Sequence, residues 1–242
     1  AEGIYEKGFT YGSLKFGAKH IQSFTKQEVQ QNGVFKSDLN QMETSVFSEW
    51  NHSKDKFSCS LGLKANRVHF SNISINKSYY NFLPKAMLGY RLNENSFIRY
   101  DVEMSQTNPT LVELTDTEIR LDPYLAERGN LLLKPYSNLN NNLFYEHKKG
   151  LFTFNANLRH HYKHNPIMES VKEQGNIFLI IPENMKSWNK YNAEMNLKVG
   201  MIKNILQFSL TGGYNHFNSQ GNNYSHEYSN FYYSANVLAM YK

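Results

Sequence analysis

Residues 151–164 read LFTFNANLRHHYKH, and apolar and polar side chains alternate along them. Every second side chain from Phe152 to Leu158 is apolar, and the same face ends in histidine and tyrosine. The intervening side chains are almost all polar. Because the side chains of a β-strand point alternately to opposite faces, this period of two predicts a strand with two different surroundings. The polar face then borders either bulk water or the water-filled interior of a barrel.

The same alternation recurs in about ten segments along the chain of 242 residues. No sustained helical period of 3.6 residues accompanies them, and no apolar run approaches the ~18 residues of a transmembrane helix. We therefore expect an all-β chain, an antiparallel up-and-down meander of about ten strands that forms a single β-barrel segment over residues 1–242. The clearest segments are residues 57–66, 82–92, 98–105, 190–199 and 206–215.

The connections between these segments alternate in length. In an up-and-down meander, this order places every short turn at one end of the sheet and every long loop at the other. Outer-membrane barrels sort their loops in this way, with short periplasmic turns and long extracellular loops. Short connections are expected at residues 51–56, 93–95, 147–150 and 200–204. Long connections are expected at roughly 26–40, 71–79, 106–137, 165–187 and 218–230.

Strand length and composition agree with a membrane barrel. A tilted strand rises about 2.5 Å per residue along the membrane normal, so the ten steps from Phe152 to Tyr162 span about 25 Å, the height of a barrel's outward apolar band. Only 40% of the residues are apolar, which is low for the packed core of a soluble protein of this size. Aromatic residues reach 14% and suit girdles at the two interfaces. We therefore expect part of a transmembrane β-barrel that is apolar outside and polar inside.

Charge, cysteine content and motifs argue against several other classes of function. The net charge is +5, but basic residues are dispersed among acidic ones, so no nucleic-acid partner is expected. The single cysteine, Cys59, excludes an internal disulfide framework and a cysteine-based zinc site. No common catalytic or nucleotide-binding motif occurs, so we expect neither an enzyme nor a cofactor. We interpret Arg99, Asp101 and Glu103 as a salt-bridge ladder on a wet lumen wall rather than as catalytic groups.

The histidines of residues 160–164, HHYKH, raise the question of a metal site. His160 and His164 share one face of the strand but lie two pleats apart, and His161 points to the opposite face. Metal ligands must converge on one point, and no cysteine or carboxylate partner lies nearby in the sequence. The pattern therefore favours a basic rim at the level of the lipid headgroups, and we predict no metal site.

Residues 127–147, ERGNLLLKPYSNLNNNLFYEH, resemble a pattern in the barrels of TonB-dependent outer-membrane receptors of the Bacteroidetes type. In that family, a Gly-Asn-Pro-x-Leu-Lys-Pro-Glu run ends a long loop and leads into a strand. Leu131 stands where the family usually has proline, and Tyr136 where it often has glutamate. The resemblance covers most of the chain and is specific over residues 79–168. The matching positions are Gly129, Asn130, Leu133, Lys134 and Pro135.

The resemblance implies part of the barrel of a receptor in the cell outer membrane that binds and imports a nutrient ligand. Its partners would be outer-membrane lipid, an unknown nutrient ligand and the TonB complex, which such receptors contact through an N-terminal plug. The family's barrels have about 22 strands. Because about ten strands and no plug are recognisable here, we expect a partial barrel whose exposed edge strands make it self-associate when it is produced alone.

The candidate ligand contacts come from two regions. The resemblance implies that loops at the barrel mouth touch ligand, which makes Tyr124 and Arg128 of the long loop 106–137 candidates. Alternation places Arg159, His161 and Lys163 on a basic lumen wall near that mouth. A structural or surface-display outer-membrane β-protein without transport activity is the alternative function.

Overall fold

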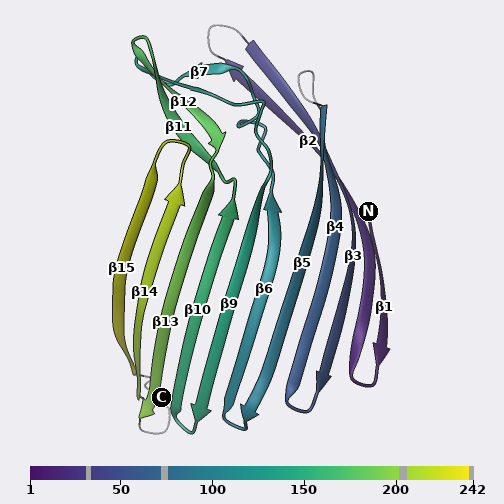
Figure 1. Cartoon of the computed structure of the whole chain (residues 1–242), viewed down its shortest axis with the longest axis vertical. Helices are drawn as coiled ribbons and strands as arrows, with labels where there is room; N and C mark the ends of the chain where they lie inside the picture. Colours follow the sequence, from purple (N-terminus) through teal and green to yellow (C-terminus); the bar gives the residue numbers. More distant parts are fainter. Residues whose placement is uncertain (31–33, 72–75, 202–205, 240–242) are drawn as a thin grey trace.

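A computed structural model describes residues 1–30, 34–71, 76–201 and 206–239, with the side chains of 27–30, 34–37 and 39 outside this description. The described residues form one eleven-stranded antiparallel sheet and one four-stranded sheet (Figure 1). No helix long and apolar enough to cross a membrane occurs among them. The prediction of an all-β antiparallel meander is therefore confirmed.

The large sheet contains eleven strands, where the sequence predicted about ten. The additional strand is the first, whose residues carry too little alternation to be recognised. Neighbours in the sheet follow the order of the sequence except where the strands of the small sheet intervene. In spatial order the strands are β1 (Glu2–Phe9), β2 (Gly12–Gln30), β3 (Val34–Lys54), β4 (Phe57–Ser71), β5 (Asn76–Asn93), β6 (Ser96–Thr107), β9 (Tyr136–Lys149), β10 (Phe152–His164), β13 (Ser187–Met201), β14 (Leu206–Gln220) and β15 (Ser225–Ala239).

The register of the strands joins their apolar faces into one surface. Leu158 of β10 lies opposite Leu143 of β9 on one side and opposite Ala193 of β13 on the other. Further along the sheet, Leu61 of β4 lies opposite Ala86 of β5. Because side chains alternate, a slip of one residue in any pair would place a polar face within this apolar surface. The binary pattern therefore specifies the register as well as the strands.

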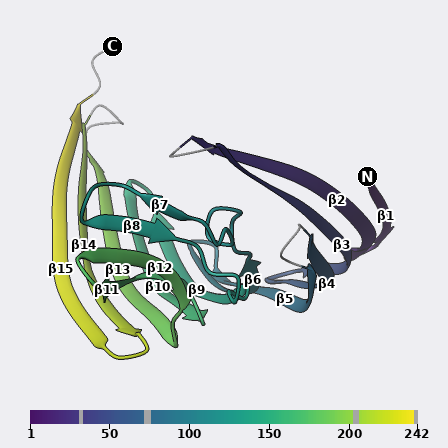
Figure 2. The same ribbon diagram turned by 90° about the horizontal axis from the view of Figure 1, so that it is seen from above.

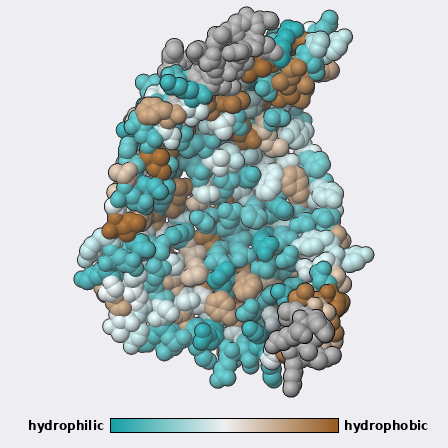
Figure 3. Space-filling model, turned by 180° about the vertical axis from the view of Figure 1, so that it is seen from behind, coloured by the Kyte–Doolittle hydropathy of each residue, from teal (hydrophilic) through white to brown (hydrophobic). Residues whose placement is uncertain are grey.

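The large sheet curls into an open trough (Figure 2). The joined apolar faces form its convex side, where Trp50, Leu158 and Tyr191 are all more than 40% exposed. The concave side is mostly hydrophilic (Figure 3). β1 and β15 are the outermost strands, and each pairs with a neighbour along one side only. This arrangement is an apolar outside and a polar inside, as the sequence predicts.

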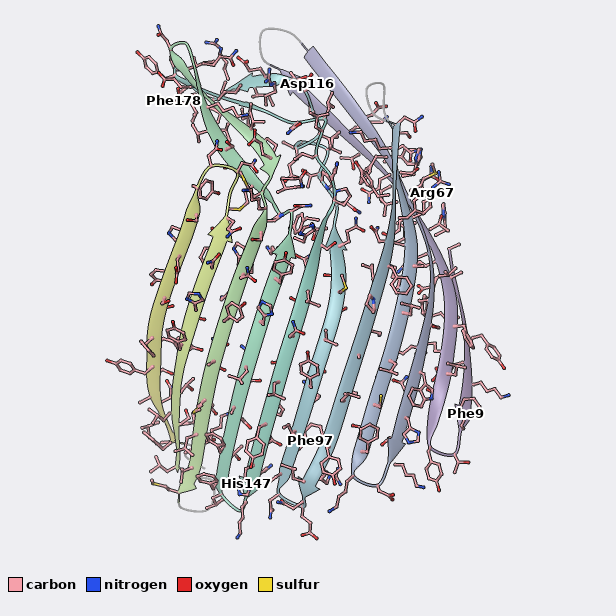
Figure 4. All side chains as sticks on the ribbon, viewed as in Figure 1. Phe9, Arg67, Phe97, Asp116, His147 and Phe178 are labelled. Atoms are coloured by element: carbon pink, nitrogen blue, oxygen red, sulfur yellow. The ribbon has the colours of Figure 1, made fainter. Side chains whose placement is uncertain are left out.

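The two ends of the sheet carry different connections. Phe97 and His147 lie near the end with the short turns, whereas Asp116 and Phe178 lie beyond the opposite end, where the long connections gather (Figure 4). The predicted sorting of the loops is therefore confirmed. The predicted turn at 200–204 falls mostly at residues 202–205, outside the described residues.

Three of the predicted long loops are wrong in extent. Strands continue through most of 26–40, 71–79 and 218–230, because β2 ends only at Gln30 and β4 only at Ser71. The connections at 31–33 and 72–75 lie outside the described residues. These extensions carry many polar residues, so the apolar–polar alternation stops while backbone pairing continues.

The other two long loops contain the small sheet. Its strands have the order β11-β12-β8-β7, with β12 and β8 parallel. The small sheet lies at the upper end of the large one (Figure 1) and over its concave side (Figure 2). The predicted long connections 106–137 and 165–187 therefore match the structure in extent, but the strands within them were not predicted. The strands are β7 (Glu118–Arg120), β8 (Leu125–Arg128), β11 (Ile167–Gln174) and β12 (Ile177–Asn184).

Candidate functional site: the lumen wall and the mouth

The polar face of β10 presents Arg159 and His161 to the concave side of the sheet. Arg159 lies opposite Asn192 of β13, and His161 lies opposite Lys190 of the same strand. With Tyr232 of β15, these side chains line an open depression of about 450 Å³. We call this depression the lumen-wall site. Two of the three predicted basic residues of β10 therefore belong to one surface.

Hydrogen bonds hold the centre of the lumen-wall site in place. The Tyr232 hydroxyl donates to Glu194 Oε2 at 2.7 Å, and Arg159 Nη2 lies 3.9 Å from Glu194 Oε1. Asn192 Nδ2 donates both to Asn215 Oδ1 at 3.0 Å and to the Tyr232 hydroxyl at 3.1 Å. The single carboxylate is thereby engaged by a cation and a phenol. The network fixes the positions of Arg159, Asn192, Glu194 and Tyr232, and it leaves neighbouring side chains of the site available to bind a ligand.

Two groups of the lumen-wall site have capacity to bind a ligand. Among the residues that the structure describes, none forms a hydrogen bond or ion pair with the Lys190 side chain, which can donate three hydrogen bonds. His161 Nδ1 donates to Asn140 Oδ1 at 2.7 Å, which leaves Nε2 free to accept. Cations next to amides suit an anionic or oxygen-rich polar ligand.

On the same concave face, the charged side chains of β3, β4 and β5 pair with one another. Lys64 Nζ lies 2.8 Å from Glu43 Oε1, and Lys85 pairs with Glu49. These pairs neutralise neighbouring charges on facing strands, so that part of the wall offers fewer unpaired groups than the lumen-wall site. Lys190 of the β10–β13 region, in contrast, stands next to the ordered network of the lumen-wall site without an ion-pair partner among the described residues.

Lys163 does not line the lumen-wall site. Its ammonium lies 4.8 Å from the centre of the Trp188 ring and 5.8 Å from that of Tyr136. Such cation–π contacts hold the charge against the wall at the mouth end of β10. The structure therefore separates Lys163 from Arg159 and His161, with which the sequence grouped it.

The two candidates from the long loop lie in the small sheet and not together. Tyr124 is 68% exposed between β7 and β8, and its carbonyl accepts a hydrogen bond from the Phe178 amide at 2.7 Å. Arg128 Nε lies 3.9 Å from Asp116 Oδ1 and lines a pocket of about 220 Å³ between β8, β11 and the segment before β7. Their role as ligand contacts remains a prediction.

The first residues of the recognised motif join the small sheet to the segment that precedes it. The Gly129 amide donates to the Thr115 carbonyl at 2.9 Å, and a Cβ atom at Gly129 would lie only 2.4 Å from that oxygen. Asn130 Nδ2 donates to the Pro182 carbonyl at 3.0 Å. The chain at Gly129 therefore approaches its neighbour more closely than any side chain allows.

The second half of the motif anchors the loop in the lumen. Leu133 is 1% exposed and packs against Val68 and Phe70 on the concave face of β4. The Lys134 amide and carbonyl both bond to the Asn184 side chain, and Pro135 leads into β9. Leu133 of the motif, Val68 and Phe70 of β4, and Leu111 and Leu114 of the long connection thus form one buried apolar cluster.

The profile of the outer membrane protein beta-barrel family matches residues 5–242, nearly the whole chain. The chain belongs to this family. Members of the family are located in the outer membrane, which fixes the convex apolar face of the trough as the lipid-facing side and the concave face as the lumen. No curated protein sequence matches the chain.

Solved structures of similar fold include receptors and transporters. A mutant of the ferric enterobactin receptor PfeA from Pseudomonas aeruginosa is 15% identical, with a TM-score of 0.67 over 96% of this chain and 40% of the receptor. The iron transporter FrpB of Neisseria meningitidis is 11% identical, with a TM-score of 0.67 over 90% and 36%. The copper transporter OprC is 9% identical, with a TM-score of 0.65 over 93% and 42%. The chain thus spans about 40% of the length of these proteins, and the likeness establishes the fold.

His160 and His161 of β10 lie on opposite sides of the barrel wall. His160 stacks on Tyr191 with ring centres 4.4 Å apart on the lipid-facing side, while His161 faces the lumen. Within residues 1–30, 34–71, 76–201 and 206–239, no group of three or more histidine, cysteine or acidic side chains could hold a metal ion. The salt-bridge interpretation is borne out at Arg99, whose Nε lies 2.9 Å from Asp101 Oδ2.

Sequence reasoning missed the partners of Arg159 in the lumen-wall site. Lys190, Asn192 and Glu194 are visible in the sequence as the polar face of a strand, but alternation does not say which strand lies beside them. The small sheet separates β10 and β13 by 22 residues of chain, from 165 to 186. The missing signal is the cross-strand register, which pairs Arg159 with Asn192.

Proposed function

We propose that the chain forms part of the barrel of an outer-membrane receptor that binds a nutrient ligand and imports it. The observation that carries this proposal is the lumen-wall site, where Lys190 and His161 offer free hydrogen-bonding capacity beside an ordered network. The shared fold with iron and copper transporters supports it.

We further propose that this chain is a partial barrel and that transport depends on the TonB complex. The outer strands β1 and β15 each have one unpaired side, and a barrel of this family needs further strands to close. A plug in the lumen would contact the TonB complex and couple ligand release to energy from the inner membrane. The trough leaves its concave face open to such a plug.

The ligand class follows from the chemistry of the lumen-wall site. Arg159 and Lys190 contribute two positive charges, and Glu194 contributes one negative charge. Amides and a phenol supply further donors and acceptors. A polar nutrient with several oxygen atoms and net negative charge, such as a metal chelate, fits this surface better than an apolar or cationic compound.

The test is uptake of labelled metal chelates, glycans and peptides by cells that carry the intact gene or the Lys190→Gln variant. We expect at least one anionic ligand to be taken up only when TonB is present. Loss of the hydrogen bonds from Lys190 should weaken its apparent affinity on the order of tenfold. Lys198→Gln is the matched control, because Lys198 lies on the lumen face of the same strand but outside the lumen-wall site.

The opposite outcomes have distinct meanings. Uptake of a ligand with equal affinity in both variants would contradict the assignment of the lumen-wall site. Absence of any TonB-dependent uptake would contradict the receptor function and favour the structural or surface-display alternative.

A further inference from the structure

The apolar ladder on the lipid-facing side of β4 ends in a basic residue. Alternate positions from Phe57 through Leu61 to Ala65 are apolar, and the next two outward positions are Arg67 and His69. The ten steps from Phe57 to Arg67 span about 25 Å along the membrane normal. Arg67 lies toward the end of the sheet where the long connections gather (Figure 4). The guanidinium therefore stands at the outer boundary of the apolar band, where lipid headgroups begin.

Neighbouring side chains orient Arg67 without neutralising it. Arg67 Nη2 donates to Ser78 Oγ at 3.1 Å, and its guanidinium carbon lies 5.9 Å from the centre of the Tyr80 ring. His69 Nδ1 lies 3.0 Å from the same Ser78 oxygen. In the described part of the chain, no carboxylate contacts Arg67. The remaining guanidinium N–H groups are therefore free to donate to an anion outside the protein.

The surface around Arg67 is built from donors and aromatic rings. Thr44 of β3 lies opposite Arg67, and its hydroxyl lies 2.8 Å from His20 Nδ1 on β2. Tyr80 is 75% exposed and Phe82, one step deeper on β5, is 63% exposed. The nearest outward-facing acid on β3 is Asp38, which lies opposite Lys26. The patch formed by Arg67, His69, Ser78, Tyr80 and Phe82 thus combines a positively charged group with exposed aromatic rings beside it.

We propose that this patch binds the phosphate of a phosphorylated lipid in the outer leaflet of the outer membrane. Arginine presents planar pairs of N–H donors that match phosphate oxygens, and His69 and the Ser78 hydroxyl border the same point. The exposed rings of Tyr80 and Phe82 lie against the first carbons of the acyl chains. Attachment of the phosphate to a lipid is required because the patch faces the bilayer and not the lumen.

The experiment reconstitutes the protein into nanodiscs of zwitterionic phosphatidylcholine that contain a small fraction of bisphosphorylated lipid A. Lipid retained after detergent extraction is counted by native mass spectrometry. We expect the wild type to retain the phosphorylated lipid and its affinity to fall on the order of tenfold in Arg67→Gln. Arg67→Lys keeps the charge but loses the planar pair of donors, so its affinity should lie between these two. Arg91→Gln is the matched control, because Arg91 lies on the lumen face near the short turns.

Each other result overturns the proposal. Equal retention of lipid A and its dephosphorylated form would show that acyl chains alone are recognised. Equal retention by Arg67→Gln and Arg91→Gln would place the binding elsewhere on the barrel. Complete displacement by millimolar inorganic phosphate would identify a site for free phosphate and not for a lipid. Correct folding of each variant is established beforehand from its heat-modifiable migration in gels.

Discussion

At the scale of single residues, Gly129 shows how a recognised motif residue can serve structure. Its amide hydrogen bond to Thr115 brings two backbones so close that a methyl group at Gly129 would meet the Thr115 oxygen at 2.4 Å. Gly129 is therefore explained by the close packing of two parts of the mouth segment, residues 108–135, against each other. Ligand contact by Gly129 itself is not needed to account for it.

We expect Gly129→Ala to loosen the mouth segment. Overpacking at such a contact costs about 1–3 kcal/mol, which should lower the free energy of local opening around residues 113–130. Hydrogen exchange of these amides measures the change. Gly212→Ala is the control, because a Cβ atom there meets nothing within 4 Å. Unchanged exchange in Gly129→Ala would contradict the close approach.

At the scale of elements, the small sheet is held to the lumen wall by a compact apolar cluster. Leu133 is 1% exposed in this cluster, whereas the adjacent Leu132 is 76% exposed. Lys77 Nζ donates to the Leu131 carbonyl at 2.8 Å and strengthens the same attachment from β5. The mouth segment is thus a fixed cover over part of the lumen.

Leu133→Ala and Leu132→Ala form a matched pair for this attachment. Truncation of a buried leucine costs about 2–5 kcal/mol, whereas truncation of an exposed one usually costs within about 0.5 kcal/mol. We expect only Leu133→Ala to make residues 108–135 sensitive to protease added outside the cell. Equal sensitivity of the two variants would show that the cluster does not hold the segment.

Alternation predicted the elements of the large sheet better than the elements of the mouth. The segments around Leu61, Leu88 and Leu158 cross the bilayer, so one face of each must be apolar and the period of two is clear. In the small sheet, strands as short as Glu118–Arg120 offer too few positions for a period to be seen. For the lumen-wall site, alternation predicted that Arg159 and His161 face the lumen. It did not predict which residues of β13 lie beside them, because that depends on the register between strands.

At the scale of the whole molecule, the two outer strands dominate the behaviour of the chain. β15 carries Phe231, Tyr233 and Val237, which are 83%, 88% and 67% exposed. Within the described residues, its outer side and that of β1 also present backbone groups with no strand beside them. Exposed edges of this kind recruit other strands.

We therefore expect residues 1–242, produced alone in detergent, to form dimers or larger assemblies in light scattering. The double substitution Phe231→Lys and Tyr233→Lys should reduce this association, because charges on an edge strand oppose pairing with another strand. Asn215→Lys is the control, because Asn215 faces the lumen away from the edge. A monodisperse monomer of the unsubstituted chain would contradict the expectation.

The most direct test of the barrel-wall account is solvent accessibility along β10. Single cysteines are placed at each position from Phe152 to Tyr162 in a Cys59→Ser background, spin-labelled and measured in native outer membranes. We predict a period of two, in which oxygen relaxes the labels at even positions and a water-soluble nickel complex relaxes those at odd positions. Nickel accessibility at even positions such as 154, 156 and 158 would show that this face meets water, and would contradict a lipid-facing apolar band around a polar lumen.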